Sequence, residues 1–192
     1  MTVPAIHMKT QIMLDLETLG QQPGSVIVAI GAVKFGNGEI HDTFYERVDA
    51  ESCVALGLRM DVSTVLWWMK QNDEARKEIT QPGIHLTQAL LQFSLWMGDI
   101  DAEVWGNGAN FDNVLLSDAY DRALLKRPWK YYNDRCYRTV KNLRPEIPMM
   151  RGGTHHNALD DARSQAMHLM AMIPDNAKYT NLAGETETKE TV

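Results

Sequence analysis

Apolar and polar positions along the first quarter of the chain predict three consecutive strands. Residues 11–16 form a short apolar run that ends in acidic residues, which is typical of a buried central strand. After a turn at 20–24, the β-branched run 26–35 passes through Gly-Asn-Gly at 36–38, a strong hairpin signal, into the run 40–48. We therefore expect three antiparallel strands to come first in the fold.

Helical spacing dominates the rest of the chain. One further short strand is expected at 103–105, where an apolar segment runs into the glycine-rich residues 106–108. The order of elements predicts an α/β fold, in which helices flank a mixed sheet. The predicted helices are 64–71, 73–79, 86–97, 111–125 and 158–173.

Length and composition fit a single domain with a substantial core. Of the 192 residues, 44% are apolar, and we assign residues 1–175 to that domain. The polar residues 176–192 are expected to form a disordered tail. No window approaches the roughly 18 apolar residues of a membrane span, and residues 1–10 lack the apolar core of a signal peptide. Cys53 and Cys136 lack metal-ligand spacing and suggest reduced thiols, so we expect a cytoplasmic protein.

The charge is unevenly distributed. A net charge of −6 argues against a protein that wraps long nucleic acid, but not against an enzyme that grips a strand end. Nine of the 19 Lys and Arg lie between Arg122 and Arg151. This basic stretch, interleaved with aromatic residues, would either follow a phosphate backbone or form a solvated helix face over core aromatics. For each single residue we favour the solvated helix face over core aromatics. For the stretch as a whole, both interpretations stay open. The aromatic residues are Trp129, Tyr131, Tyr132 and Tyr137.

Acidic residues provide the strongest chemical signal. Asp15 and Glu17 are two positions apart on a strand, so both side chains point to the same face. A cation between them would offset their repulsion, and we favour this reading over a solvated strand end. Asp112 lies where a helix begins and would by itself favour the helix dipole. The small residues at 106–108, just before it, would let a nucleic-acid strand approach the backbone.

The start of the last helix separates two adjacent acids. If Asn157 is the N-cap, Asp160 occupies the third helical position and completes a capping box. Asp161 is then free for function. His156, just before the helix, has a pKa near neutrality and is the favoured general base, with His155 as the weaker candidate.

Two adjacent tryptophans, Trp67 and Trp68, lie on a predicted helix. Neighbouring helical positions point about 100° apart, so one ring should be more buried than the other. A more exposed ring would be available to stack on substrate or contact a partner, but core packing is favoured for both.

The pattern Asp15-x-Glu17, Asp112 and His156-x4-Asp161 resembles the DEDDh branch of the DnaQ-like 3′–5′ exonucleases. The resemblance runs from about residue 11 to residue 173. Within that family, other segments resemble phage exonuclease A and the prophage exonuclease VIII-like proteins. These segments are Ser-Thr-Val-Leu-Trp-Trp-Met-Lys-Gln at 63–71, Glu-Ala-Arg at 74–76, Tyr-Asn-Asp-Arg at 132–135 and Arg-Thr at 138–139.

The resemblance implies a ribonuclease-H-like fold and catalysis with two divalent cations, Mg²⁺ or Mn²⁺. Asp15 would bridge the ions, Glu17 and Asp161 would complete one site, Asp112 would support the other, and His156 would be the base. Thr18 and Leu19 would hold the terminal nucleoside, although Thr18-Leu19-Gly20 departs from the commoner Thr-Thr-Gly. Further substrate contacts are expected from Asn107, Asn110, Arg135 and Arg138.

The expected reaction releases nucleoside 5′-monophosphates from nucleic acid 3′ ends. The resemblance to phage exonuclease A favours single-stranded DNA, and RNA is the first alternative. A second alternative is an inactive nucleic-acid-binding module with the same fold, and a third is a phosphoesterase acting on small molecules. All five catalytic positions are filled, which favours an active enzyme.

Overall fold

A five-stranded sheet with the order β3-β2-β1-β4-β5 forms the centre of the computed structural model, which describes residues 9–98 and 101–173. The first three strands pair antiparallel, β4 pairs in parallel with β1, and β5 pairs in parallel with β4. This arrangement confirms the prediction that three antiparallel strands come first. The strands are β1 (Gln11–Thr18), β2 (Ile27–Gly36), β3 (Glu39–Arg47), β4 (Glu103–Gly106) and β5 (Asp134–Cys136).

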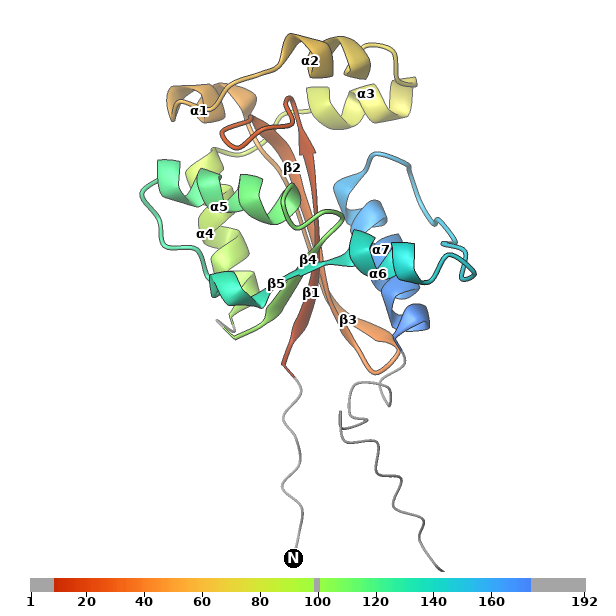
Figure 1. Ribbon diagram of the computed structural model, residues 1–192. Helices are drawn as coiled ribbons and strands as arrows, with labels where there is room; N and C mark the ends of the chain where they lie inside the picture. The colour runs from red at the N-terminus through yellow and green to blue at the C-terminus, as the bar shows by residue number, and fades with distance from the viewer. Residues whose placement is uncertain (1–8, 99–100, 174–192) are drawn as a thin grey trace, which may run out of the picture.

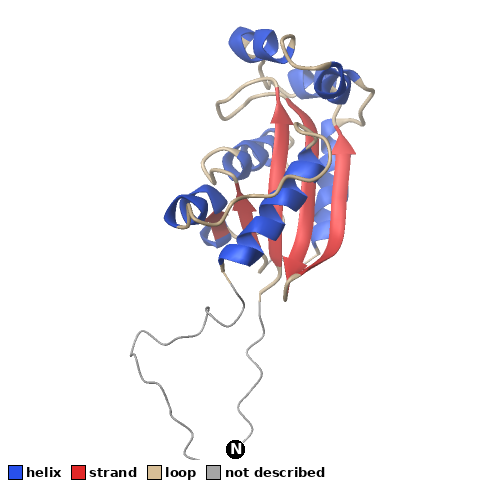
Figure 2. Cartoon of the chain, turned by 90° about the vertical axis from the view of Figure 1, so that its right-hand side faces the viewer, coloured by secondary structure: helices blue, strands red, loops and turns tan. Residues whose placement is uncertain are grey.

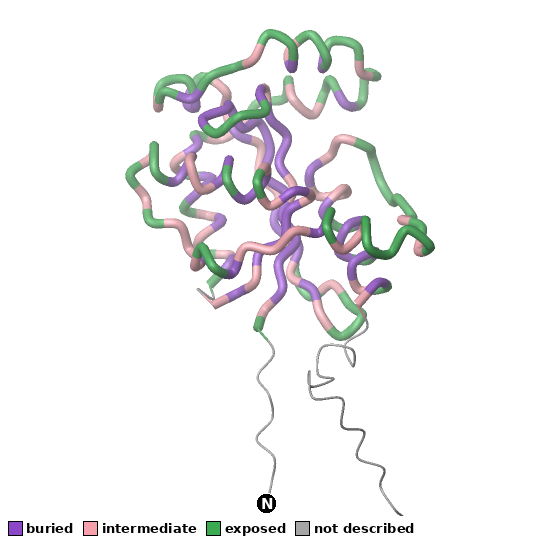
Figure 3. Tube along the Cα trace, viewed as in Figure 1, coloured by how far each residue is buried: buried purple, intermediate pink, exposed green. Residues whose placement is uncertain are grey.

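Helices cover both faces of the sheet, because alternate residues of β1 point to opposite sides. Ile12 and Leu14 pack into the cluster beneath α4 (Leu86–Met97) and α5 (Asp112–Arg122). Met13 packs into the cluster beneath α6 (Tyr137–Leu143) and α7 (Ala158–Met172). Figure 1 shows these pairs of helices on the two sides of the sheet, and Figure 3 shows the strands between them as mostly buried.

Three short helices lie beyond the end of the sheet toward which β1 runs (Figure 1). They are α1 (Ala50–Ala55), α2 (Val62–Trp68) and α3 (Asp73–Thr80). The indole N–H of Trp68 donates to the backbone carbonyl of Thr18 at 2.9 Å, which fixes α2 to the end of β1.

The longer predicted elements are confirmed with shifts of a few residues at their ends. The predicted helix 111–125 ends at Arg122, and the predicted strand 11–16 continues to Thr18. The sequence patterns missed α1, α6, β5 and the 3₁₀ turn η1 (Tyr131–Asn133), each of seven residues or fewer. Elements this short carry too few residues to show a period. The predicted tail 176–192 and most of the N-terminal segment 1–10 lie outside the described residues.

Among the described residues, no helix combines the length and the apolar character needed to cross a bilayer.

Candidate active site

Asp15 and Glu17 extend from β1 on the same face as Met13, beside α7. Their partners across β2 are Gly31 and Ala29, which leave room next to the two carboxylates. Glu17 is only 7% exposed, and Asp15 is half-buried. The two-residue spacing on the strand therefore places both acids on one face of the sheet, as predicted.

The first turn of α7 brings Asp161 to these two acids. Gly31 allows this approach, since a Cβ built on it would lie 2.2 Å from the carbonyl carbon of Ala158. Figure 2 shows α7 lying across the strands. Carboxylate oxygens of Asp15, Glu17 and Asp161 lie within 4.8 Å of one another. Residues nearly 150 positions apart thus form one oxygen-rich cluster.

Asp112 lines the same pocket, of about 230 Å³, as these three acids. It begins α5, is almost fully buried, and accepts the backbone N–H of Leu16 at 3.2 Å. Its charge also makes the largest electrostatic contribution to raising the pKa of Asp15. All four predicted carboxylates therefore surround one pocket.

Burial disfavours ionisation of Asp15, Glu17 and Asp112, and repulsion between acids adds to this effect for Asp15 and Glu17. Burial is the first cause of each shift: it raises the pKa of Asp15 well above its usual range, that of Glu17 to about 8 and that of Asp112 to about 7. For Glu17, the charges of Asp161 and Asp112 add to this effect. Divalent cations such as Mg²⁺ bind oxygen ligands and supply the missing positive charge. The four carboxylates therefore fit a divalent metal centre.

The cap of α7 is confirmed, but one predicted contact is wrong. The Asn157 side chain accepts the backbone N–H groups of Leu159 and Asp160. The Asp160 carboxylate does not close a capping box onto Asn157. It accepts the backbone N–H of Thr154 at 2.8 Å instead, because the chain turns tightly before the helix and brings that N–H within reach.

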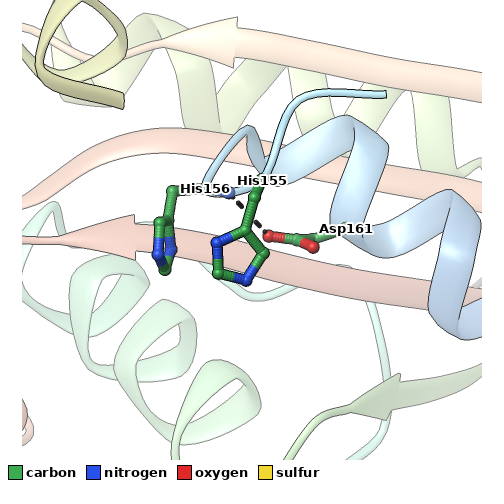
Figure 4. A group of neighbouring side chains, drawn as sticks. All are labelled: His155, His156 and Asp161. Carbon is green, nitrogen blue, oxygen red and sulfur yellow. Dashed lines mark hydrogen bonds between the residues drawn. The ribbon is translucent and has the colours of Figure 1, made fainter. Parts of the chain in front are cut away.

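Two histidines precede α7 and lie next to Asp161 (Figure 4). The backbone N–H of His156 donates to Asp161 Oδ2 at 3.1 Å, and its φ of 64° turns the chain sharply at this point. The ring centroids of His155 and His156 are 3.8 Å apart. Partial burial, followed by the charge of His155, lowers the pKa of His156 and favours its neutral form. Both imidazoles line the pocket.

Trp67 and Trp68 differ in burial, as expected for neighbouring positions on a helix. Trp68 is 2% exposed, which confirms core packing, whereas Trp67 is 43% exposed, so the core assignment was wrong for Trp67. The ring centroids of Trp67 and Trp68 lie 5.1 and 5.6 Å from that of His156. Both tryptophans line a second pocket of about 350 Å³, which shares Leu16, Glu17 and Phe111 with the first.

The predicted substrate contacts fall into two groups. Asn107 and Arg138 line the acidic pocket, and Thr18 lines the neighbouring one. The remaining three lie among the lining residues of neither pocket. Leu19 packs on the hydrophobic core and Asn110 is exposed on the loop before α5. Arg135 is held by the carboxylate of Glu103 at 2.7 Å.

Most of the basic stretch does not face the site. Trp129 and Tyr137 are buried, whereas Tyr131 and Tyr132 are exposed. Several Lys and Arg side chains of the basic stretch form ion pairs elsewhere on the surface, with Asp118, Asp101, Glu103 and Glu146. Of the nine basic residues in the stretch, Arg138 and Arg151 are the two that line the acidic pocket.

Two polar residues in the pocket, Gln165 and Arg151, were not predicted from sequence. Gln165 donates from its side-chain amide to Asp15 Oδ1 at 2.7 Å. It follows Asp161 by four residues, and this one-turn spacing on α7 was a signal that could have identified it. Arg151 donates to Asp161 Oδ1 at 2.7 Å. Nothing in its local sequence distinguishes it from the other arginines of the basic stretch.

Known proteins resemble this chain in sequence and in fold. The exodeoxyribonuclease of Enterobacteria phage T4 is 26% identical over 121 residues, which are 55% of this chain and 53% of the phage protein. The chain therefore spans about half the length of that relative. The solved structures below share less than 25% identity with the chain, so their likeness concerns the fold.

E. coli exonuclease I in complex with a dA16 oligonucleotide matches with a TM-score of 0.62 and 14% identity. The match covers 90% of this chain and 43% of that protein. Its zinc-bound complex with single-stranded DNA matches with a TM-score of 0.57 and 16% identity, over 86% of this chain and 40% of that one. A 3′-exonuclease that recognises the histone mRNA stem-loop matches with a TM-score of 0.60 and 14% identity. This match covers 88% of this chain and 83% of that protein.

These neighbours confirm the predicted ribonuclease-H-like exonuclease fold. The sequence profile of the 3′–5′ exoribonuclease Rv2179c-like domain matches residues 10–173, which include all four acids and both histidines of the pocket. The chain therefore belongs to the Rv2179c-like family of 3′–5′ exonuclease domains.

Proposed function

We propose that this protein is a metal-dependent 3′–5′ exonuclease that releases nucleoside 5′-monophosphates from single-stranded DNA. The observation that carries the proposal is the convergence of four carboxylates and a mostly neutral imidazole on one pocket. Three of the carboxylates place oxygens within 4.8 Å of one another. Family membership and the fold of the structural neighbours support the same reaction class.

Two divalent cations, Mg²⁺ or Mn²⁺, would be held by four residues: Asp15, Glu17, Asp112 and Asp161. Such cations, when bound, supply an activated water and neutralise charge on the phosphate. The zinc-bound form of E. coli exonuclease I is consistent with metal use in this fold.

Other side chains of the pocket would accept a proton and bind the phosphate backbone. His156 takes the proton of the attacking water, because its lowered pKa keeps the ring neutral near pH 7. Arg138 and Arg151 stand on the wall of the same pocket and offer positive charge to the phosphate backbone. Asn107 lies beside them, with its backbone carbonyl bound by Arg138.

The neighbouring pocket suits the terminal nucleoside. It adjoins the acids at Glu17 and is lined by Thr18 and by the exposed ring of Trp67. An aromatic face of this kind stacks on any base, as an enzyme that removes successive nucleotides requires. The structure gives Leu19 and Arg135 other contacts, so we assign them no role in binding.

RNA is the second candidate substrate. The T4 relative is an exodeoxyribonuclease, which supports DNA, whereas the family is described as exoribonucleases, which supports RNA. Both readings use the same pocket. They differ in whether contacts to a 2′-hydroxyl are made.

Matched single-stranded DNA and RNA oligomers, labelled at the 5′ end, test the proposal in Mg²⁺ and in Mn²⁺. We expect a ladder that shortens from the 3′ end, release of nucleoside 5′-monophosphates, and no reaction with Asp15→Ala. The faster ladder identifies the preferred sugar. Binding without cleavage would instead support the inactive module, and hydrolysis confined to dinucleotides or nucleotide analogues would support a small-molecule phosphoesterase.

A further inference from the structure

Arg151 contacts a residue that the proposed function assigns to metal binding. Its guanidinium donates to Asp161 Oδ1 at 2.7 Å. The Arg151 side chain is 50% exposed, whereas the Asp161 side chain is only 14% exposed and lines the pocket. A half-exposed cation therefore contacts a carboxylate that a divalent ion would need.

The two oxygens of Asp161 have different partners. Oδ2 accepts the backbone N–H of His156 at 3.1 Å, while Oδ1 accepts the Arg151 side chain. The first contact is part of the main chain and fixes the orientation of the carboxylate. The second contact is made by the end of the long Arg151 side chain. Departure of Arg151 would free Oδ1 without releasing Asp161 from its position.

The loop that carries Arg151 is held on α7 by its backbone. The N–H of Gly152 donates to Ser164 Oγ at 3.1 Å, and the N–H of Thr154 donates to Asp160 Oδ2 at 2.8 Å. These contacts do not involve the Arg151 side chain. The guanidinium can thus exchange partners while the loop stays in place.

We propose that Arg151 is an internal counter-ion of the metal centre, bound to Asp161 in the metal-free protein and displaced by the incoming divalent cation. The inference rests on the proposed function, because it takes Asp161 as a metal ligand. A guanidinium and a divalent cation repel each other and compete for the same carboxylate. The released guanidinium remains on the pocket wall, where a phosphate would bind.

Calorimetric titration of Mn²⁺ into the metal-free protein tests the exchange, because it measures binding without catalysis. We expect Arg151→Gln to bind Mn²⁺ about two- to fivefold more tightly than wild type, the size expected for a half-exposed ion pair. Arg138→Gln is the matched control. It removes the same charge from the same pocket, and that charge also acts on Asp112, but among the described residues the Arg138 guanidinium donates to the backbone carbonyl of Asn107 and forms no ion pair. Its effect should therefore be clearly smaller.

The outcomes separate the inference from the proposed function. Unchanged or weaker Mn²⁺ binding by Arg151→Gln would overturn the exchange, as would an equal gain in Arg138→Gln, which would indicate a general charge effect. Wild-type binding that Asp15→Ala does not remove would overturn the metal centre itself, and the inference with it. Thermal unfolding of each variant without metal checks that the fold is retained.

Discussion

Gly31 of β2 lies directly beneath Ala158, the first residue of α7. A Cβ on Gly31 would come within 2.2 Å of the Ala158 carbonyl carbon and 2.4 Å of its oxygen. Gly31 is also the strand partner of Asp15. Since Asp161 lies in the first turn of α7, this contact sets the distance between the acids of β1 and the acid of α7.

Gly31→Ala should separate the acids. We expect the overpacked variant to lose about 1–3 kcal/mol of unfolding free energy and to bind Mn²⁺ more weakly, because α7 must shift away from β2. Urea unfolding and calorimetric titration measure the two effects. Gly36→Ala is the control on the same strand, where the nearest atom to the new Cβ is the flexible His41 ring nitrogen at 3.6 Å. Wild-type stability and metal binding in Gly31→Ala would contradict the role of this contact.

The adjacent acids Asp160 and Asp161 should respond differently to substitution. Asp160→Ala removes the acceptor of the Thr154 N–H and should cost about 1 kcal/mol of stability, with most activity retained. Asp161→Ala removes a carboxylate of the oxygen cluster and should abolish cleavage. Oligonucleotide cleavage rates and urea unfolding test both variants. Equal losses of activity would show that the two acids do not divide structural and catalytic roles.

His156→Ala should slow cleavage by about 10²–10⁴-fold, the usual contribution of a general base. His155→Ala is the matched control, because its ring lies next to that of His156 and lines the same pocket. We expect a much smaller effect for that variant. Single-turnover rates at pH 7.5 provide the comparison. A larger loss in His155→Ala would transfer the base role to that residue.

The raised pKa values predict how metal-free stability depends on pH. The folded protein holds protons on Asp15 and Glu17 at pH values where the unfolded chain has lost them. Stability therefore falls as the pH rises from the unfolded values, near 4, toward about 8 for Glu17. Urea unfolding in EDTA at several pH values should show this decline.

Asp15→Asn tests the same prediction from the other direction. The amide cannot ionise, so it removes both a desolvated charge and its repulsion on Glu17. We expect this variant to be about 1–3 kcal/mol more stable than wild type at pH 8 without metal, with the difference shrinking toward pH 5. A pH-independent difference would show that the carboxylates do not repel as inferred.

Trp67→Ala should weaken substrate binding more than catalysis. Stacking on one base is worth about 1–3 kcal/mol, so we expect KM for an oligonucleotide to rise about tenfold or more with a smaller change in kcat. Leu66→Ala is the control, since Leu66 is exposed on the same helix but is not among the residues lining the pocket. Equal effects of the two substitutions would argue against stacking on Trp67.

Features that depend on neighbouring residues followed from the sequence. A period of two on β1 placed Asp15 and Glu17 on one face, and the Asn157 cap was predicted from its position before a helical run. The order of acids and histidine also led to the correct family. These inferences succeed because backbone geometry fixes the direction of side chains within a single element.

Contacts between remote elements were decided by the tertiary structure. The sequence did not distinguish Arg151, which contacts Asp161, from Arg135, which pairs with Glu103. It also placed Trp67 in the core, although packing of α2 on the end of β1 buries Trp68 and leaves Trp67 beside the site. The physical reason is that the partner of a long side chain depends on which surfaces meet in space. Local periodicity sets the face of an element, and packing sets what that face contacts.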